Sequence, residues 1–545
     1  MFLKTDTNSM TAHYAQVPTI SHQRNSFSVA EKHVTTLAFD KLYTLNWKYM
    51  YPGDTLNVTS ALMARLTTQV SDLFDDLYFD LHAWFVPFRL IQTNWARYQF
   101  NAQPGGPSQD NSALTSPKID LTTLWDAGGG NRQFKAKSNY DYWGLPTAIN
   151  FASAFLNTQH INNYLGRAYN LIWNLNYRDE NLQNPVTVDL GDGPDNYNDY
   201  ATVLPRGKRH DMITSSLPFL QKGTPVGTPV LGTANIETNG TPPTWNATGM
   251  SNVQMRSTVG TAAVVTAAAP SASSAMSFGN ESGLRVNFNT SLAFFAINDL
   301  RYSASVQHLL EADARGGTRD VESIKHRWGV TVPDFRLQRP EYLGGQTFTF
   351  DGHVVPQSSA TVPGQSPQAH LAAFSQAMNS MNITHSFVEH GVFMILLSLR
   401  SNITYQQGLQ RELSHKTRLD WFNPEFSNIG EQALLVKEVA VTDSAGINDA
   451  AFGYQEYGYW LRYGFNRVSS EMRSVYPTSR DYKHMAQVFS SLSGLSGAFI
   501  QSFTPIDRNI TVASSVADPV EINSILKGNL VRTLPMYSVP GLARL

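Results

Sequence analysis

The chain has 545 residues, with 41 Lys and Arg against 43 Asp and Glu, and it contains no cysteine. This near-neutral balance excludes the basic footprint of a dedicated nucleic-acid-binding protein, and the missing cysteines exclude disulfides, thiolate catalysis and cysteine-ligated zinc. Charged residues make up only 15% of the chain, whereas about 25% is typical. We therefore expect much of the outer surface to be buried against other chains.

The N-terminal segment, residues 1–30, is polar and has little periodicity. It predicts an arm that is ordered only by contact with another molecule, or equally a disordered tail. The segment lacks the apolar core of a signal peptide, and no run in the chain approaches the roughly 20 apolar residues of a membrane span. We expect synthesis inside the cell and no membrane insertion.

The stretch from residue 45 to residue 100 predicts the centre of the core. In its second half, alternate residues fall on opposite faces of an extended strand, and both faces are largely apolar. One face holds Phe79, Leu81, Ala83 and Phe85, and the other holds Tyr78, Asp80, His82 and Trp84. A strand covered on both faces belongs between two layers, and Pro87 marks its end or an edge. The pattern predicts a central strand of a mainly β jelly-roll domain over residues 31–545.

Helical signals appear between the strand-like segments. Pro146 suits the first turn of a helix. Beyond Gly166, one face is marked at helical spacing and is better explained by core packing than by ligand binding; it consists of Ala168, Tyr169, Ile172, Trp173 and Asn176. Further helices are predicted from Ala296 to Gly316 and over 319–328. Residues 386–405 read as a near-continuous apolar strand.

The segment 223–291 differs from its surroundings because it is rich in Thr, Pro, Gly, Ala, Ser and Asn. With few large apolar residues it cannot form much core of its own. A loop of this length inside a compact protein is usually functional or disordered. We interpret it as an exposed insertion supported by its neighbours.

Two basic clusters are candidate nucleic-acid contacts. Arg206, Lys208 and Arg209 could bind phosphate, because clustered cations displace its counterions. The alternative, which we favour, makes them ion-pair partners of the acidic loop 189–199 or of a neighbouring subunit. A second, looser cluster has the same two interpretations; it comprises Arg411, His415, Lys416 and Arg418.

The most metal-like group is His385, Glu389 and His390. In a strand the first two share a face and His390 points to the other, so the three side chains would not converge on an ion. The motifs of nucleophile elbows, zinc-protease helices and nucleotide-binding loops do not occur in the sequence. We predict no metal, no cofactor and no enzymatic activity.

Ten segments, in order along the chain, closely resemble the major capsid protein of gokushoviruses, small single-stranded DNA phages of the Microviridae. The resemblance extends over about residues 45–508. It is carried by YPGDTLNV, FVPFRL, YDYWGLP, GRAYNLIWNLNYRDENLQ, LPRGKRHDMITSSLPFLQKG, LLEADARGGTRDVESIKHRWGV, RLQRPEYLGG, THSFVEHG, TYQQGLQREL and FGYQE.

The resemblance implies an eight-stranded viral jelly roll with helices in its long loops. It also implies a T=1 icosahedral shell of identical chains around a circular single-stranded DNA genome, with 223–291 as a three-fold surface protrusion that meets a host cell-surface receptor. A near-neutral chain would contact DNA weakly and locally, leaving most neutralisation to a small basic DNA-binding protein, and scaffolding or minor virion proteins are further expected partners. The alternative is a jelly-roll carbohydrate-binding or host-recognition protein of a phage particle.

Overall fold

The fold is known from a computed structural model, in which the chain divides into two compact units. The first unit comprises Met1–Pro218 and Pro333–Leu545, and the second is Phe219–Val332. The structure describes residues 23–100, 114–128, 130–224, 226, 235–238, 244–247, 250–254, 277–278, 284–287, 297–315, 326, 338–356 and 371–537. Most of the predicted insertion, most of the predicted helix over 319–328 and the predicted cap at Gly316 lie outside these residues.

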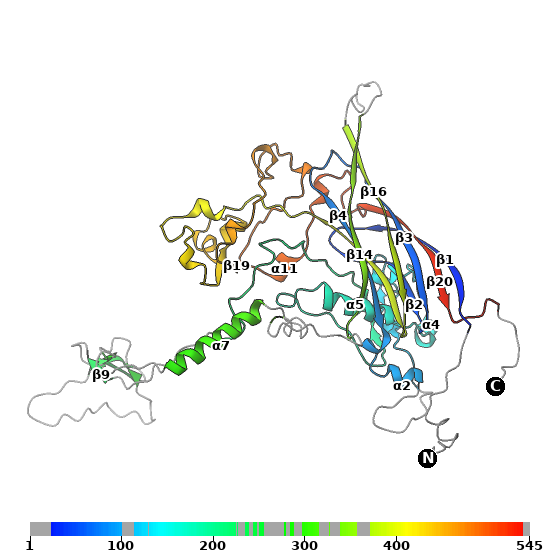
Figure 1. The fold of residues 1–545 in the computed structure, drawn as a ribbon, viewed down its shortest axis with the longest axis horizontal. Helices are drawn as coiled ribbons and strands as arrows, with labels where there is room; N and C mark the ends of the chain where they lie inside the picture. Colours follow the sequence, from blue (N-terminus) through cyan, green and yellow to red (C-terminus); the bar gives the residue numbers. More distant parts are fainter. Residues whose placement is uncertain are drawn as a thin grey trace, which may run out of the picture. The chain divides into compact units, whose positions relative to one another are not determined.

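Two antiparallel sheets form the centre of the first unit (Figure 1). The β20 sheet has the strand order β1 (Asn25–Leu37), β20 (Val520–Arg532), β3 (Thr55–Leu66), β16 (Leu371–Ser386) and β15 (Asp351–Pro356). The β17 sheet has the order β14 (Glu341–Thr349), β4 (Leu77–Pro87), β17 (Gly391–Ser401) and β2 (Leu42–Met50). Because β1 begins at Asn25 and pairs with β20 along its whole length, the last residues of the predicted N-terminal arm belong to a sheet.

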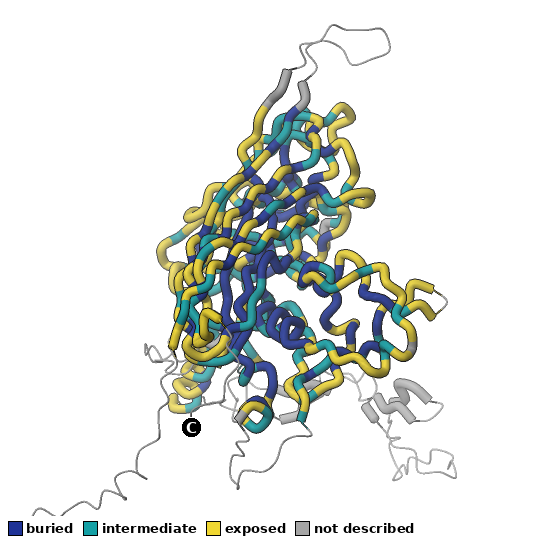
Figure 2. Tube along the Cα trace, turned by 90° about the vertical axis from the view of Figure 1, so that its right-hand side faces the viewer, coloured by how far each residue is buried: buried dark blue, intermediate teal, exposed yellow. Residues whose placement is uncertain are grey.

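The two sheets share one hydrophobic core. It joins Val58 of β3 and Leu526 of β20 to Phe79, Leu81 and Phe85 of β4, and in Figure 2 buried residues follow the inner strands beneath an exposed outer surface. On its other face β4 contributes Trp84 and Val86 to a second core. The prediction of an internal strand that is covered on both faces and ends at Pro87 is confirmed.

Strand β17 is buried at every residue, as its apolar run predicts. The predicted near-continuous strand is nevertheless interrupted, because β16 ends at Ser386 and the chain turns before β17 begins at Gly391. A Cβ at Gly391 would lie 2.4 Å from the carbonyl oxygen of Val86. Only glycine fits this close approach, which lets the turn enter directly beside β4.

Helix α5 (Tyr164–Asn176) belongs to the core on the outer face of the β17 sheet. The predicted apolar face is buried, while Asn176 at its end is exposed. The helix predicted from Pro146 is wrong: residues 145–150 are not helical and α4 is Ser153–Thr158. Bridges from Phe134 to Thr147 and from Arg132 to Phe151 hold this segment extended.

Short elements complete the first unit. They are α2 (Trp95–Phe100), β5 (Ile119–Asp120), β6 (Trp125–Asp126), β7 (Arg132–Gln133), α3 (Asn139–Tyr142), β8 (Asp195–Asn196), α6 (Tyr197–Ala201), β18 (Glu431–Leu435), α9 (Val436–Val439), α10 (Ala445–Asn448), β19 (Ala451–Glu456) and α11 (Gly497–Ile500). Residues 400–520 therefore consist mainly of turns and short helices, with a small core of their own around Leu434, Phe452 and Trp460.

The second unit contains helix α7 (Ile297–Arg315), which confirms the helix predicted from Ala296. Its described strands pair antiparallel; they are β9 (Asn235–Thr238), β10 (Thr244–Ala247), β11 (Met250–Gln254), β12 (Ser277–Phe278) and β13 (Leu284–Asn287). Helix α7 exposes Ile297, Leu300, Tyr302 and Leu309. Within the described parts of both units, no helix combines the length and the apolar character that crossing a bilayer requires.

Candidate nucleic-acid interface

The backbone of the basic cluster is fixed to other parts of the first unit. The Arg206 amide donates to the carbonyl of Asp40, 2.8 Å away, and the Lys208 amide donates to the carbonyl of Ile500, also at 2.8 Å. Gly207 forms a bridge with Gln501. The segment therefore connects the turn before β2 to the residues around the end of α11. These backbone hydrogen bonds fix the positions from which its side chains extend.

The Arg206 guanidinium lies over the ring of Tyr177, 4.4 Å from its centroid, which is a favourable cation–π arrangement. The side chain is partly buried, and its Nε has no hydrogen-bond partner among the described residues. Burial, reinforced by the charge of Arg400, lowers the pKa of Arg206 to about 10. Arg206 is therefore still a cation at neutral pH.

Lys208 is only 6% exposed. Its Nζ lies 3.8 Å from the ring centroid of Phe499 and 5.3 Å from that of Phe489. Among the described residues the ammonium group has no hydrogen-bond partner. Burial lowers the pKa of Lys208 to about 8, while the charges of Asp211 and Asp40 act in the opposite direction.

Arg209 lies over the ring of Tyr78, 4.0 Å from its centroid, and its Nη1 is 3.8 Å from Oδ1 of Asp80. Asp80 also accepts hydrogen bonds from Arg400 and from the Thr347 hydroxyl. The charge of Arg400 and these bonds keep the pKa of Asp80 below its usual range although burial raises it.

The acidic loop that we expected to pair with the basic cluster has a different partner. Asp195 accepts from Nε of Arg167 at 2.8 Å, and both side chains are fully buried. The expectation that residues 189–199 neutralise the cluster is therefore wrong, because Arg209 pairs with Asp80 of β4 instead. Pairing of the cluster with a neighbouring subunit stays a prediction. The nucleic-acid contact of Arg206, Lys208 and Arg209 stays a prediction.

The second basic cluster does not act as one group. Arg411 donates to Glu438 at 3.0 Å and lies over the ring of Trp460. The His415 ring packs against Trp421. Lys416 and Arg418 are exposed, so these two alone present their charge to solvent.

The metal-like residues lie around the turn between β16 and β17, and their side chains face different partners. Nε2 of His385 is 3.5 Å from Glu341, and Glu389 accepts from Arg89 at 2.7 Å. His390 packs against the rings of Trp95 and Tyr51. In the part of the chain that the structure describes, no three His, Asp or Glu side chains are placed to hold a metal ion.

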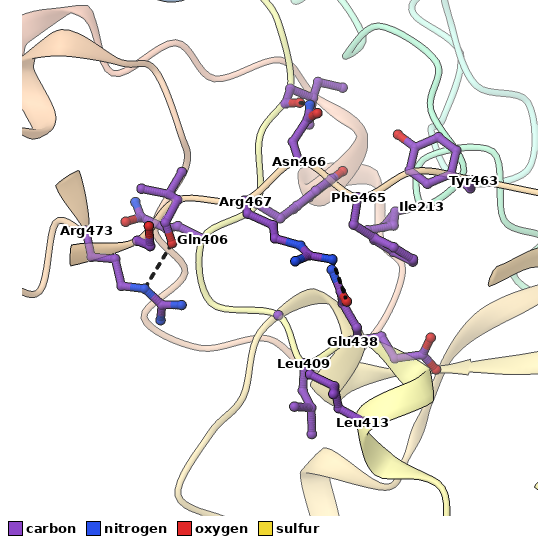
Figure 3. A pocket seen from close by; sticks show the side chains of 16 residues that line it. Ile213, Gln406, Leu409, Leu413, Glu438, Tyr463, Phe465, Asn466, Arg467 and Arg473 are labelled. Atoms are coloured by element: carbon purple, nitrogen blue, oxygen red, sulfur yellow. Dashed lines mark hydrogen bonds between the residues drawn. The ribbon is translucent and has the colours of Figure 1, made fainter. Parts of the chain in front are cut away.

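One pocket, of about 310 Å³, lies between residues 403–413 and 463–473 (Figure 3). Arg467 donates to Gln410 at 3.4 Å, and Arg473 donates to the carbonyl of Val468 at 3.0 Å. The carboxylate of Glu438, whose pKa is raised by burial, accepts from Tyr459 at 2.6 Å and from Arg411. These polar groups satisfy one another, and the arrangement fixes the two segments together.

A second cavity, of about 630 Å³, combines aromatic rings with arginines. We name it the aromatic–arginine pocket; it is lined by His82, Trp84, Asn176, Tyr177, Arg206, Arg339, Pro340, Glu341 and Tyr342. His82 Nδ1 is 2.7 Å from the Tyr177 hydroxyl, and burial lowers the pKa of His82 to about 4. The imidazole is therefore neutral at pH 7.

Sequence reasoning did not find this pocket. Its residues come from β4, the end of α5, the basic cluster and the start of β14. His82 and Trp84 were recognised only as the second face of a strand. The one available signal was the pair of polar residues, Asp80 and His82, on a face that also holds Tyr78 and Trp84.

The chain is similar to known proteins along nearly its whole length. A family model described as capsid protein (F protein) matches residues 15–542. The chain is 37% identical to capsid protein VP1 of Bdellovibrio phage phiMH2K, over 92% of each chain. It is 33% identical to capsid protein VP1 of Chlamydia phage 1, over 98% of each, and 28% identical to that of Spiroplasma virus 4, over 96% of each.

Proposed function

The chain belongs to the capsid protein (F protein) family of phages, and on this premise we propose that it builds a T=1 icosahedral shell around a circular single-stranded DNA genome. The chain is a structural protein of the virion, and the resemblance to gokushovirus capsid proteins is confirmed. The match along nearly the whole chain is the observation that carries the proposal, because few residues are left for an unrelated activity.

The strand order supports a viral jelly roll. When the long strands β1, β2, β3, β4, β14, β16, β17 and β20 are numbered one to eight in chain order, one sheet reads 1-8-3-6 and the other 2-7-4-5. Two interleaved Greek keys produce this order. In this interpretation β15 is an additional edge strand, and the loops between strands four and five and between seven and eight hold most of the remaining chain.

Exposed apolar side chains support extensive contacts between subunits. The segment 413–429 is one place where they lie close together in sequence; it exposes Leu413, Leu419, Trp421, Phe422 and Ile429. Apolar side chains that are exposed together often belong to a surface that binds another protein. Together with the low charge content, this favours burial of the segment against another copy of the chain.

The second unit contains the proposed surface protrusion, residues 223–291. Helix α7 leaves Ile297, Leu300, Tyr302 and Leu309 exposed, so it has apolar surface available for other molecules. We assign the insertion 223–291 to the three-fold axes of the shell and to contact with a host cell-surface receptor. This unit is compact in itself, which suits a protrusion.

Genome contacts are proposed to be weak and local, because the chain carries a net charge of only −2. Arg206, Lys208 and Arg209 are the candidate contacts. A small basic DNA-binding protein would supply most of the neutralising charge, and scaffolding or minor virion proteins would assist assembly. The chain would be synthesised in the bacterial cytoplasm and would act without catalysis.

Electron microscopy of the expressed full chain, with scaffolding proteins added where needed, tests the proposal. We expect closed particles of uniform diameter, and a reconstruction with the genome inside would give the position of each loop relative to the axes. Chains that stay monomeric under every assembly condition would contradict the proposal.

A further inference from the structure

We propose that the aromatic–arginine pocket binds one nucleotide of a single-stranded nucleic acid, with the base against Tyr342 and the phosphate at Arg206 and Arg339. The inference rests on the proposed function, because it takes the packaged genome as the ligand. It adds a defined site to that function and makes Tyr342 its main contact.

Tyr342 offers an accessible stacking surface. The side chain is 53% exposed, although its ring lies 4.9 Å from that of Trp84 and 5.9 Å from that of His82. The inner side of the ring is thus supported while the rest remains open to solvent. Exposed rings of this kind bind unpaired bases, because every base has a π face.

The backbone of β14 is built to place Tyr342 in this position. The register against β4 shifts between Tyr342 and Gly344, so that Tyr342 lies opposite Trp84 and Gly344 lies opposite Ala83. Gly344 has a φ of +137°, which other residues rarely adopt. A Cβ at Gly345 would lie 2.3 Å from the Tyr342 hydroxyl oxygen. This bulge and the two glycines hold the tyrosine ring across the strand, as bulges often do near binding sites.

The pocket has an excess of positive charge. Its lining contains Arg206 and Arg339 against one carboxylate, Glu341, which lies 3.5 Å from His385. The nearby Asp80 is already engaged by Arg400 and Arg209. The Tyr177 ring positions the Arg206 guanidinium, whose buried Nε has no partner among the described residues. Guanidinium groups bind phosphate through paired hydrogen bonds.

The floor of the pocket predicts binding without sequence preference. The Trp84 indole donates to the Tyr177 hydroxyl at 3.1 Å, and the same hydroxyl contacts His82. The indole N–H, Nδ1 of His82 and the Tyr177 hydroxyl are therefore engaged with one another and do not read the edge of a base. Stacking and phosphate contacts remain, and neither distinguishes one base from another.

Binding of a short oligothymidylate to the full-length chain tests the site. Tyr342→Ala should weaken binding at least fivefold, because loss of one base–aromatic stack costs about 1–3 kcal/mol, whereas Tyr342→Phe should change it less than twofold. Arg339→Ala should reduce the slope of log affinity against log salt by about 0.7, the value for one phosphate contact on a single strand. The matched controls are Tyr476→Ala, an exposed tyrosine that does not line the pocket, and Arg462→Ala, an exposed arginine paired with Glu456; both should bind like the unaltered chain.

Ultraviolet cross-linking of genome-filled particles gives a second readout that needs no variant. We expect a nucleotide mass on a peptide that contains Tyr342. Cross-links elsewhere but not on this peptide would overturn the site, as would unchanged oligonucleotide binding by Tyr342→Ala and Arg339→Ala. Binding of an acidic aromatic peptide can be measured with the same variants. If the substitutions weaken peptide binding but not oligonucleotide binding, the pocket binds a protein partner and the nucleotide proposal is overturned. Failure of the chain to form particles would contradict the proposed function, whereas the binding measurements would still decide the pocket.

Discussion

The carboxylate of Asp54 accepts two hydrogen bonds from the guanidinium of Arg532, a residue 478 positions further along the chain. Nε lies 3.0 Å from Oδ1 and Nη2 lies 2.6 Å from Oδ2. Asp54 is inaccessible to solvent and also accepts from the amide of Tyr51 at 2.9 Å, while Gly53 between them has a φ of +87°. The Tyr-Pro-Gly-Asp turn before β3 is thus tied to the end of β20.

Replacing Asp54 tests this connection. Asp54→Ala should reduce the free energy of unfolding by about 2–4 kcal/mol, because it leaves a partly buried guanidinium without its partner and removes the side-chain acceptor of the turn. The midpoint of urea unfolding measures the effect. Asp449→Ala is the matched control, since Asp449 is exposed in its pair with Lys437 and should cost less than about 1 kcal/mol. Equal costs for the two variants would contradict the structural role of Asp54.

The lowered pKa of Lys208 predicts that the stability of the protein rises with pH in the alkaline range. Its folded-state pKa, about 8, lies below the ordinary value of 10.5, so the unfolded chain binds more protons between these values and stability should rise with pH across this window. Lys208→Met keeps the packing against Phe489 and Phe499 but removes the charge. It should stabilise the protein at pH 7 by roughly 1–3 kcal/mol, and by less at pH 9.5. Thermal unfolding at both pH values measures this, and a gain that does not shrink with pH would contradict it.

The basic cluster as a whole can be tested in particles. The combined change of Arg206, Lys208 and Arg209 to Ala should lower the packaged DNA without abolishing folding, because the backbone of the segment keeps its hydrogen bonds to Asp40 and Ile500. The ratio of absorbance at DNA and protein wavelengths, measured over a range of salt, gives the result. Arg462→Ala with Arg480→Ala removes two exposed cations outside both basic clusters as a control. Unchanged DNA content and salt dependence would remove this cluster from the candidate contacts.

Deleting the insertion tests separately whether the first unit folds without it and whether host attachment requires it. Replacement of residues 223–291 by a short Gly-Ser linker should leave the melting of the first unit unchanged, since that unit has its own cores. Particles should still form but should lose attachment to host cells. An adsorption assay against unaltered particles measures the loss. If the shortened chain attaches normally, receptor contact must lie outside residues 223–291.

The strands and helices that could be predicted are those whose apolar spacing lies within one continuous segment of the sequence. The period-two pattern of β4 and the helical spacing of α5 each reflect one element packed against its neighbours, so both predictions are confirmed. The turn after β16 was missed because Phe387 and Val388 continue the apolar run, although Val388 is 82% exposed. Pro146 permits a helix start but does not require one, and distant bridges to Phe134 and Arg132 decide the outcome.

The aromatic–arginine pocket could not be predicted for a different reason. Its residues lie between positions 82 and 342, and nothing in the sequence near Tyr342 indicates which residues oppose it. The register between β14 and β4 decides which residues lie opposite Tyr342, because a shift of one residue would turn Tyr342 to the other face of β14. The same applies to Lys208, whose basic neighbours suggested an exposed cluster while tertiary contacts bury it between phenylalanine rings.

The position of β20 between β1 and β3 has a consequence for the order of synthesis. Until residues 520–532 leave the ribosome, the N-terminal strand β1 has no partner in its sheet, and β3 has one unpaired side. The sheet is therefore completed only when β20 has been synthesised, and contacts of such high sequence separation form late. A chain truncated before residue 520 would lack β20 and could not complete this sheet. Incomplete translation products would therefore be excluded from particles without the action of another protein.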